Sequence, residues 1–96
     1  MALRREGNRL LVEGPLGIET VPAVMRDAST ACREGVRVVD LAGVSDVDSA
    51  ALAFALELMR EAEAAGRKLA FENLPQAMEE LARLYAVSDL ISGEQS

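Results

Sequence analysis

The most informative property of this sequence is what it lacks. It contains no histidine and a single cysteine, Cys32, among its 96 residues. These absences exclude Ser-His-Asp and Cys-His catalytic groups as well as metal sites rich in His or Cys. Neither a GxxxxGK[ST] nor a GxGxxG phosphate-binding loop occurs. An enzyme would have to rely on carboxylates, arginines, Tyr85 or Lys68. We therefore expect no catalytic residue, no bound cofactor and no metal ion.

Lysine is almost as scarce, because Lys68 is the only one, and the formal net charge is −6. Nucleic-acid binding requires clustered Lys and Arg, so we do not expect a nucleic-acid partner. One cysteine cannot form an intramolecular disulfide, and the first residues lack the apolar run of a signal peptide. No apolar stretch is long enough to span a bilayer. We therefore expect a cytoplasmic protein without a transmembrane segment.

Aromatic residues are limited to Phe54, Phe71 and Tyr85, while half of all residues are apolar. The core must therefore be aliphatic, and we expect Tyr85 and Cys32 to pack into it. A chain of this length has too little interior to divide. The sequence predicts one domain over residues 1–96.

Turn-forming residues separate apolar runs along the whole chain. The predicted elements are strands at 2–5 and 9–13, a helix at 20–35, a strand at 36–41, a loop at 42–47, a helix at 48–65, a strand at 68–73, and a helix opened by Pro75. Gly14 to Gly17 should break the chain after the hairpin. Around Leu90 and Ile91 we expect at most a short strand or turn, before a tail that frays from about residue 88.

Strands that alternate with helices imply right-handed parallel crossovers. The predicted order is β-β-α-β-α-β-α. The predicted fold class is therefore α/β, with a mixed, mostly parallel sheet of about four to five strands and helices packed on it.

The first half of the second predicted helix carries no charge between Ser49 and Glu57. A helix on a sheet should show a polar stripe to water, so this half is either deeply buried or reserved for a partner. Its small residues would let another backbone approach closely. Asp46 and Asp48, just before it, suit the cap and the dipole of a helix N-terminus.

The stretch from Val39 to Leu52 reads VDLAGVSDVDSAAL and resembles the signature of the STAS family, in which a strand ending in Asp-Leu leads through a Val-Asp-Ser/Thr word into a helix. The stretch from Glu80 to Val87 resembles the ending of the small STAS subunits of bacterial Mla phospholipid-transport ABC complexes. The resemblance implies the STAS fold.

In that group of subunits, the Ser or Thr after the helix-start Asp lies at the contact with the cytoplasmic ATPase, MlaF. The matching pair here is Asp48 and Ser49. The resemblance thus implies a non-catalytic regulatory subunit that helps to maintain outer-membrane lipid asymmetry and sits on the inner face of the inner membrane through the transporter. The expected partner-binding residues are Asp46, Asp48, Ser49, Ala50, Ala51, Ala53 and Phe54.

Anti-sigma-factor antagonists, the other large STAS group, are the main alternative. They read Asp-Ser-Ser-Gly, and a kinase phosphorylates the second serine; here Ala50 and Ala51 replace the last two residues. A phosphorelay receiver acting through Asp40 is a further alternative, although the first strand offers no acidic pair. An exposed, uncharged half-helix would also favour homodimers when the true partner is missing.

Overall fold

The computed structural model describes residues 2–87. Over that range the elements are β1 (Ala2–Glu6), β2 (Arg9–Leu16), α1 (Val21–Arg33), β3 (Val38–Val47), α2 (Ser49–Ala64), β4 (Ala70–Glu72) and α3 (Gln76–Leu84). The predicted order β-β-α-β-α-β-α and the predicted α/β class are confirmed. The calls at Leu90 and Ile91 and on the tail lie outside the described residues.

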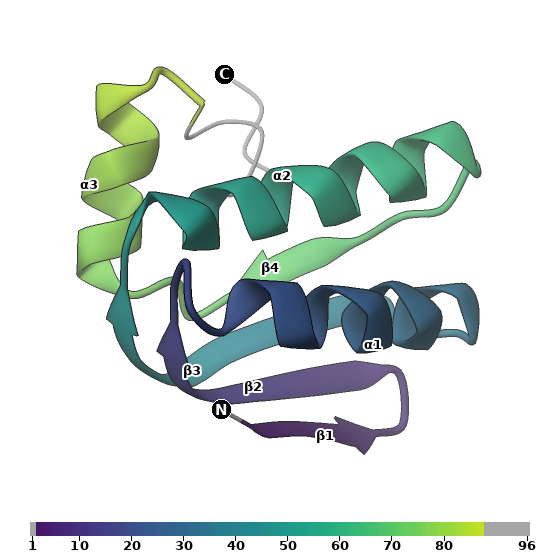
Figure 1. Cartoon of the computed structure of the whole chain (residues 1–96). Helices are drawn as coiled ribbons and strands as arrows, with labels where there is room; N and C mark the ends of the chain where they lie inside the picture. The colour runs from purple at the N-terminus through teal and green to yellow at the C-terminus, as the bar shows by residue number, and fades with distance from the viewer. Residues whose placement is uncertain (1, 88–96) are drawn as a thin grey trace.

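The sheet has the strand order β1-β2-β3-β4 (Figure 1). β1 and β2 form an antiparallel hairpin around Gly7, whose positive φ of 62° suits the turn. β2, β3 and β4 are parallel. Both parallel crossovers step in the same direction along the sheet, so right-handedness places α1 and α2 on one face. Figure 1 shows these helices side by side, with α3 beyond the start of α2.

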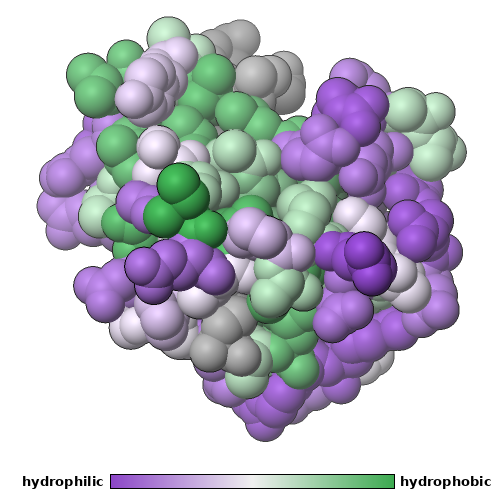
Figure 2. Space-filling view, viewed as in Figure 1, coloured by the Kyte–Doolittle hydropathy of each residue, from purple (hydrophilic) through white to green (hydrophobic). Residues whose placement is uncertain are grey.

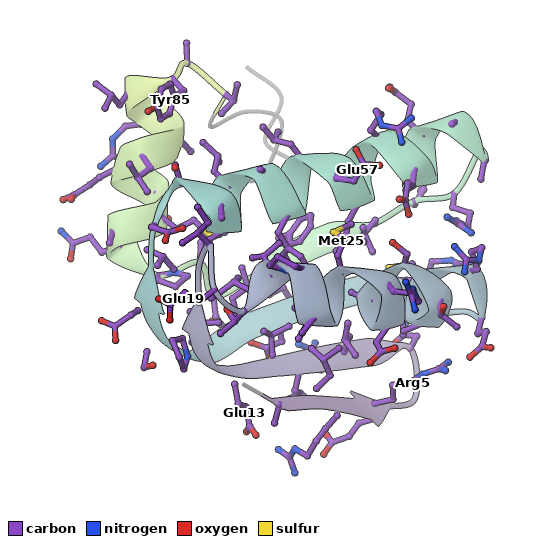
Figure 3. All side chains as sticks on the ribbon, viewed as in Figure 1. Arg5, Glu13, Glu19, Met25, Glu57 and Tyr85 are labelled. Atoms are coloured by element: carbon purple, nitrogen blue, oxygen red, sulfur yellow. The ribbon has the colours of Figure 1, made fainter. Side chains whose placement is uncertain are left out.

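The core lies between the sheet and the helices. Alternate strand residues face the helices, as period-two alternation requires. Phe54 is among the largest fully buried side chains, and the remaining core is mainly aliphatic, as predicted. The side chain of Met25, a residue of α1, lies between α1 and α2 (Figure 3). Cys32 is buried, also as predicted. The fully buried large side chains are Phe54, Leu10, Leu16, Leu41, Leu58, Met78, Val12, Val36 and Val39.

The prediction of a loop at 42–47 is wrong, and so is the predicted break after residue 13. β3 continues to Val47 and β2 to Leu16, and the two pair in parallel across two register shifts. Pro15 is tolerated in β2 because it falls at the second shift, between Gly14 and Leu16. The extension brings the ends of both strands up to the start of α2.

The prediction that Tyr85 packs in the core is also wrong. α3 ends at Leu84, and Tyr85 is 57% exposed. The chain turns at Ala86, whose φ is +60°. Tyr85 is the C-cap of α3, and its N–H still donates to the Leu81 carbonyl at 3.0 Å, but its side chain does not reach the core. Met78 and Ala82 do face the core.

Candidate functional site

Asp48 organises the start of α2. Its backbone is extended and its Oδ1 accepts a hydrogen bond from the Ala50 N–H at 2.8 Å, which makes it the N-cap. Its Oδ2 accepts a second hydrogen bond, from the backbone N–H of Ile18 at 3.0 Å. The carboxylate therefore ties the loop between β2 and α1 to the first turn of α2.

That loop is held from within as well. The Thr20 hydroxyl accepts a hydrogen bond from the Gly17 N–H at 3.0 Å and donates one to the Pro15 carbonyl at 2.9 Å. Thr20 is the residue before α1, but its side chain bonds within the loop and makes no cap hydrogen bond to the helix. Gly17 packs so closely on Asp48 that a Cβ there would lie 2.7 Å from Oδ2. The result is a fixed loop that presents Ile18 to solvent with 73% of its surface exposed.

The uncharged half of α2 has one buried side and one exposed side. One side packs in the core through Ala51, Leu52, Phe54 and Ala55. The other side leaves Ser49 and Ala53 exposed and Ala50 half-buried. The exposed side is thus a narrow strip of small residues without charge.

Two shallow hollows flank this strip. One is lined by the β2–α1 loop from Pro15 to Thr20 and by residues 46–48. The other lies between the start of α2 and α3. Asp48 and Val47 line both hollows, so the two adjoin at the start of α2. The second hollow is lined by Val47, Asp48, Ser49, Ala77, Glu80, Leu81 and Leu84.

We call the exposed strip and the two hollows together the Ser49 surface. Large apolar side chains stand on both of its sides, because Leu84 is 75% exposed and Ile18 lies in the opposite hollow. Figure 2 shows hydrophobic residues at the upper part of the end that carries α3 and across the middle of this face, with hydrophilic residues along the edge of that end and mainly hydrophilic residues at the other end. Figure 3 shows Glu19 and Tyr85 toward the same end as α3, with Arg5 at the far end.

The structure separates the predicted partner-binding residues into two sets. Asp46, Asp48, Ser49 and Ala53 are exposed, and Ala50 is half-buried. Ala51 and Phe54 require correction, because they are 0% and 1% exposed and belong to the core. They face the sheet and would support a docking surface from below without touching a partner.

Sequence reasoning missed Ile18 and Leu84. The sequence did contain a signal for Ile18. It is a large apolar residue that directly follows the turn-forming segment from Gly14 to Gly17. Leu84 carried no such signal, because its exposure depends on where α3 ends.

A separate polar cluster lies on the sheet face away from the helices. Arg9 on β2 reaches Asp40 on β3 at 3.0 Å and Glu72 on β4 at 2.7 Å through one nitrogen. Asp40 also accepts hydrogen bonds from the Asn73 side chain at 3.0 Å and from the Ala42 N–H at 2.9 Å. The hydrogen bond from Asn73, followed by those from Ala42 and Arg9, lowers the pKa of Asp40 below its usual value. Arg9 thus links β2 to β3 and β4, and the Asp40 carboxylate is occupied by three donors, which gives a receiver function no support.

Among residues 2–87, no helix has the length and apolar character needed to cross a bilayer.

Comparisons with known proteins agree with this fold. The model of the family described as MlaB, STAS domain, matches residues 1–92. The solved structure of the anti-sigma factor antagonist SpoIIAA in its unphosphorylated form superposes with a TM-score of 0.71 at 19% identity, covering 94% of this chain and 84% of that one. A candidate anti-sigma factor antagonist from Thermotoga maritima gives 0.74 at 14% identity, covering 95% and 82%. At these identities the two structures establish a shared fold. No curated protein sequence matches closely enough to count as a relative.

Proposed function

The chain belongs to the MlaB STAS-domain family, and on that premise we propose that it is a non-catalytic subunit that binds and regulates an MlaF-like cytoplasmic ATPase. The ATPase would drive a phospholipid-transport ABC complex that maintains outer-membrane lipid asymmetry. Through it the subunit would lie at the inner face of the inner membrane. The observation that carries the proposal is the uncharged exposed strip of Ser49 and Ala53, fixed in place by the Asp48 tether.

The chemistry of the Ser49 surface suits docking. Its centre offers small side chains that let a partner approach closely, and its sides offer the large apolar groups of Ile18 and Leu84. The Asp48 carboxylate at the centre already accepts two backbone hydrogen bonds. Acid–base chemistry would need a carboxylate that is free to exchange protons with a substrate, and a tethered cap is a poor candidate.

The area that a stable interface buries indicates that the partner would contact more than the exposed strip of α2. A stable protein–protein interface buries roughly 800 Å² on each partner. Ser49 and Ala53 alone cannot supply that area, so the β2–α1 loop and the end of α3 would have to take part. Fully burying a side chain such as Ile18 or Leu84 contributes roughly 1.5–3 kcal/mol. Binding of that kind would also raise the folded fraction of the subunit by mass action.

A tagged copy expressed in its native bacterium tests the proposal. Membranes are extracted with mild detergent, and bound proteins are identified by mass spectrometry. We expect an ABC ATPase together with its permease, and we expect both to be absent when the bait carries Ser49→Arg. Circular dichroism of the purified variant should match that of the wild type. Equal recovery by the Ser49→Arg bait would contradict the proposed surface.

An anti-sigma-factor antagonist remains the alternative function, motivated by the two structures that share this fold. Its switch would require a phosphorylated serine where this chain has Ala50. Incubation with an anti-sigma kinase and ATP, followed by intact-mass measurement, separates the two functions. We expect no added phosphate. Phosphorylation together with recovery of a kinase-like anti-sigma factor in the membrane experiment would favour the alternative.

A further inference from the structure

The charged residues that line the hollows of the Ser49 surface are all acidic. Glu19, Asp46 and Asp48 line the first hollow, and Asp48 and Glu80 line the second. The Asp48 carboxylate is engaged by two backbone N–H groups, whereas the other three acids are exposed. We call Glu19, Asp46 and Glu80 the rim acids.

The opposite end of the molecule is mixed in charge, with an excess of basic residues. Two hollows near the C-terminal end of α2 are lined by basic residues together with Glu61 and Glu63. The hollows at the two ends of α2 therefore differ in charge, although the molecule as a whole is acidic. The basic residues that line these hollows are Arg33, Arg37, Arg60, Arg67 and Lys68.

Favourable interaction of acidic residues with helix dipoles explains only part of this distribution of charge. Acids stabilise the first turn of a helix and have little effect farther along. Asp48 is the N-cap of α2, and that role explains its position. Glu80 lies beyond the first turn of α3, and Asp46 lies within β3. The helix dipole explains neither placement, and the structural partner of Glu80 is the Gln76 side chain, which donates an exposed hydrogen bond to it at 3.4 Å.

The rim acids surround apolar groups that are themselves exposed. Ile18 lies beside Glu19 in one hollow, and Leu84 lies with Glu80 in the other. A partner that covered Ile18 and Leu84 would bring its own side chains close to these carboxylates. An acidic partner face would repel the rim carboxylates, and a neutral one would remove water from them without replacing its hydrogen bonds. Lysine or arginine at the edge of the partner would form ion pairs with them.

On the premise of the docking function proposed above, we propose that the Ser49 surface selects a basic-edged partner. Its occupant is a face of the ATPase subunit whose apolar contact residues are flanked by lysine or arginine. The apolar groups of Ile18 and Leu84 hold the complex together, and the rim acids steer its formation and set its orientation. Such steering weakens as salt screens the charges.

The test uses the purified full chain and the purified ATPase subunit, with affinity measured at about 50 mM and about 300 mM salt, where the Debye length falls by more than half. The triple variant Glu19→Gln, Asp46→Asn, Glu80→Gln removes the rim charges and keeps their shapes. We expect about tenfold weaker binding at low salt and a much flatter salt dependence. The matched control Glu34→Gln, Glu61→Gln, Glu63→Gln changes the net charge equally at the other end and should bind like the wild type.

The outcomes separate this inference from the function on which it rests. If the rim variant keeps the salt dependence of the wild type, or if the control loses affinity equally, the inference of a basic-edged partner is overturned. The docking function is unaffected by that result as long as Ser49→Arg still abolishes binding. No binding by the wild type overturns both. If the triple variant melts early, Glu19→Gln alone should retain the fold and give a smaller change in the same direction.

Discussion

The Asp48 carboxylate and the Ile18 backbone N–H lie 3.0 Å apart, although 30 positions separate the two residues. This hydrogen bond joins the β2–α1 loop to the start of α2. Because the same carboxylate also caps α2 through Ala50, one side chain fixes both the loop and the helix. The positions of Ile18 and Ser49 on the Ser49 surface are therefore coupled through Asp48.

Replacing Asp48 with alanine should cost stability and binding together. The variant loses an N-cap, which is worth about 1–2 kcal/mol, and leaves the Ile18 N–H without its partner. Urea denaturation of the isolated chain measures the first effect, and titration with the ATPase subunit measures the second. Asp46→Ala is the matched control for the denaturation experiment, since Asp46 is an exposed acid two positions earlier in the chain. It should leave the free energy of unfolding unchanged to within about 0.5 kcal/mol.

Gly17 should be coupled to Asp48 in a double-mutant cycle. A Cβ at position 17 would lie 2.7 Å from Asp48 Oδ2, and that carboxylate cannot withdraw without breaking its own hydrogen bonds. Gly17→Ala should therefore destabilise the wild type by about 1–2 kcal/mol and the Asp48→Ala background by much less. If the two substitutions have strictly additive effects on the free energy of unfolding, the residues at positions 17 and 48 are not in steric contact.

Ile18 should matter for binding and not for folding. Its side chain is 73% exposed, while its backbone N–H, which any residue keeps, makes the bond to Asp48. Ile18→Ser should change the free energy of unfolding by less than about 0.5 kcal/mol, yet weaken binding to the ATPase subunit about tenfold or more. Ile18→Val retains most of the apolar surface and should bind nearly as well as the wild type. A loss of stability in Ile18→Ser would indicate that the loop packs differently.

The Asp40 cluster predicts a specific acid sensitivity. Because the pKa of Asp40 is lowered in the folded chain, its contribution to stability is present above the unfolded value of about 3.9 and is lost as pH falls through that value toward the folded pKa. Asp40→Asn should lower the free energy of unfolding at pH 7 by about 1–3 kcal/mol, since an amide cannot accept from all the donors that face Asp40. Between about pH 5 and pH 3 the variant should lose less stability than the wild type, as measured by urea denaturation at each pH. Parallel curves would contradict this assignment.

The order of elements was predictable because each strand and helix carries a local signal. The β-branched run from Val36 to Val39 and the glycines after the first two helices, Gly35 and Gly66, mark those boundaries directly. The continuation of β3 was not predictable in this way. Ala42 and Gly43 look like a loop when read in isolation. The strand continues through them because Gly43 pairs with Glu13 of β2, beyond a register shift at Ala42. A Cβ on Gly43 would lie 2.8 Å from the Glu13 side chain, so the close pairing depends on a residue that otherwise signals a turn.

The candidate site was only half predictable for a related reason. Alanine is compatible with a core and with a docking surface, so the run from Ser49 to Ala55 could not reveal which side would be buried. The helical period assigns Ala51 and Phe54 to one face and Ser49 and Ala53 to another, but only packing on the sheet decides which face is the core. The position of Ile18 on this surface depends on the hydrogen bond from its backbone N–H to Asp48, which no local sequence pattern predicts.

The measurement that tests the account most directly compares two alanines on the same helix. Ala53 and Ala64 are both exposed on α2, the first within the Ser49 surface and the second at the helix end. Ala53→Arg and Ala64→Arg add the same side chain, and circular dichroism should show both variants folded. Titration with the purified ATPase subunit should find the affinity of Ala53→Arg reduced about a hundredfold or more and that of Ala64→Arg unchanged. Wild-type affinity in Ala53→Arg would contradict the claim that this surface binds the ATPase.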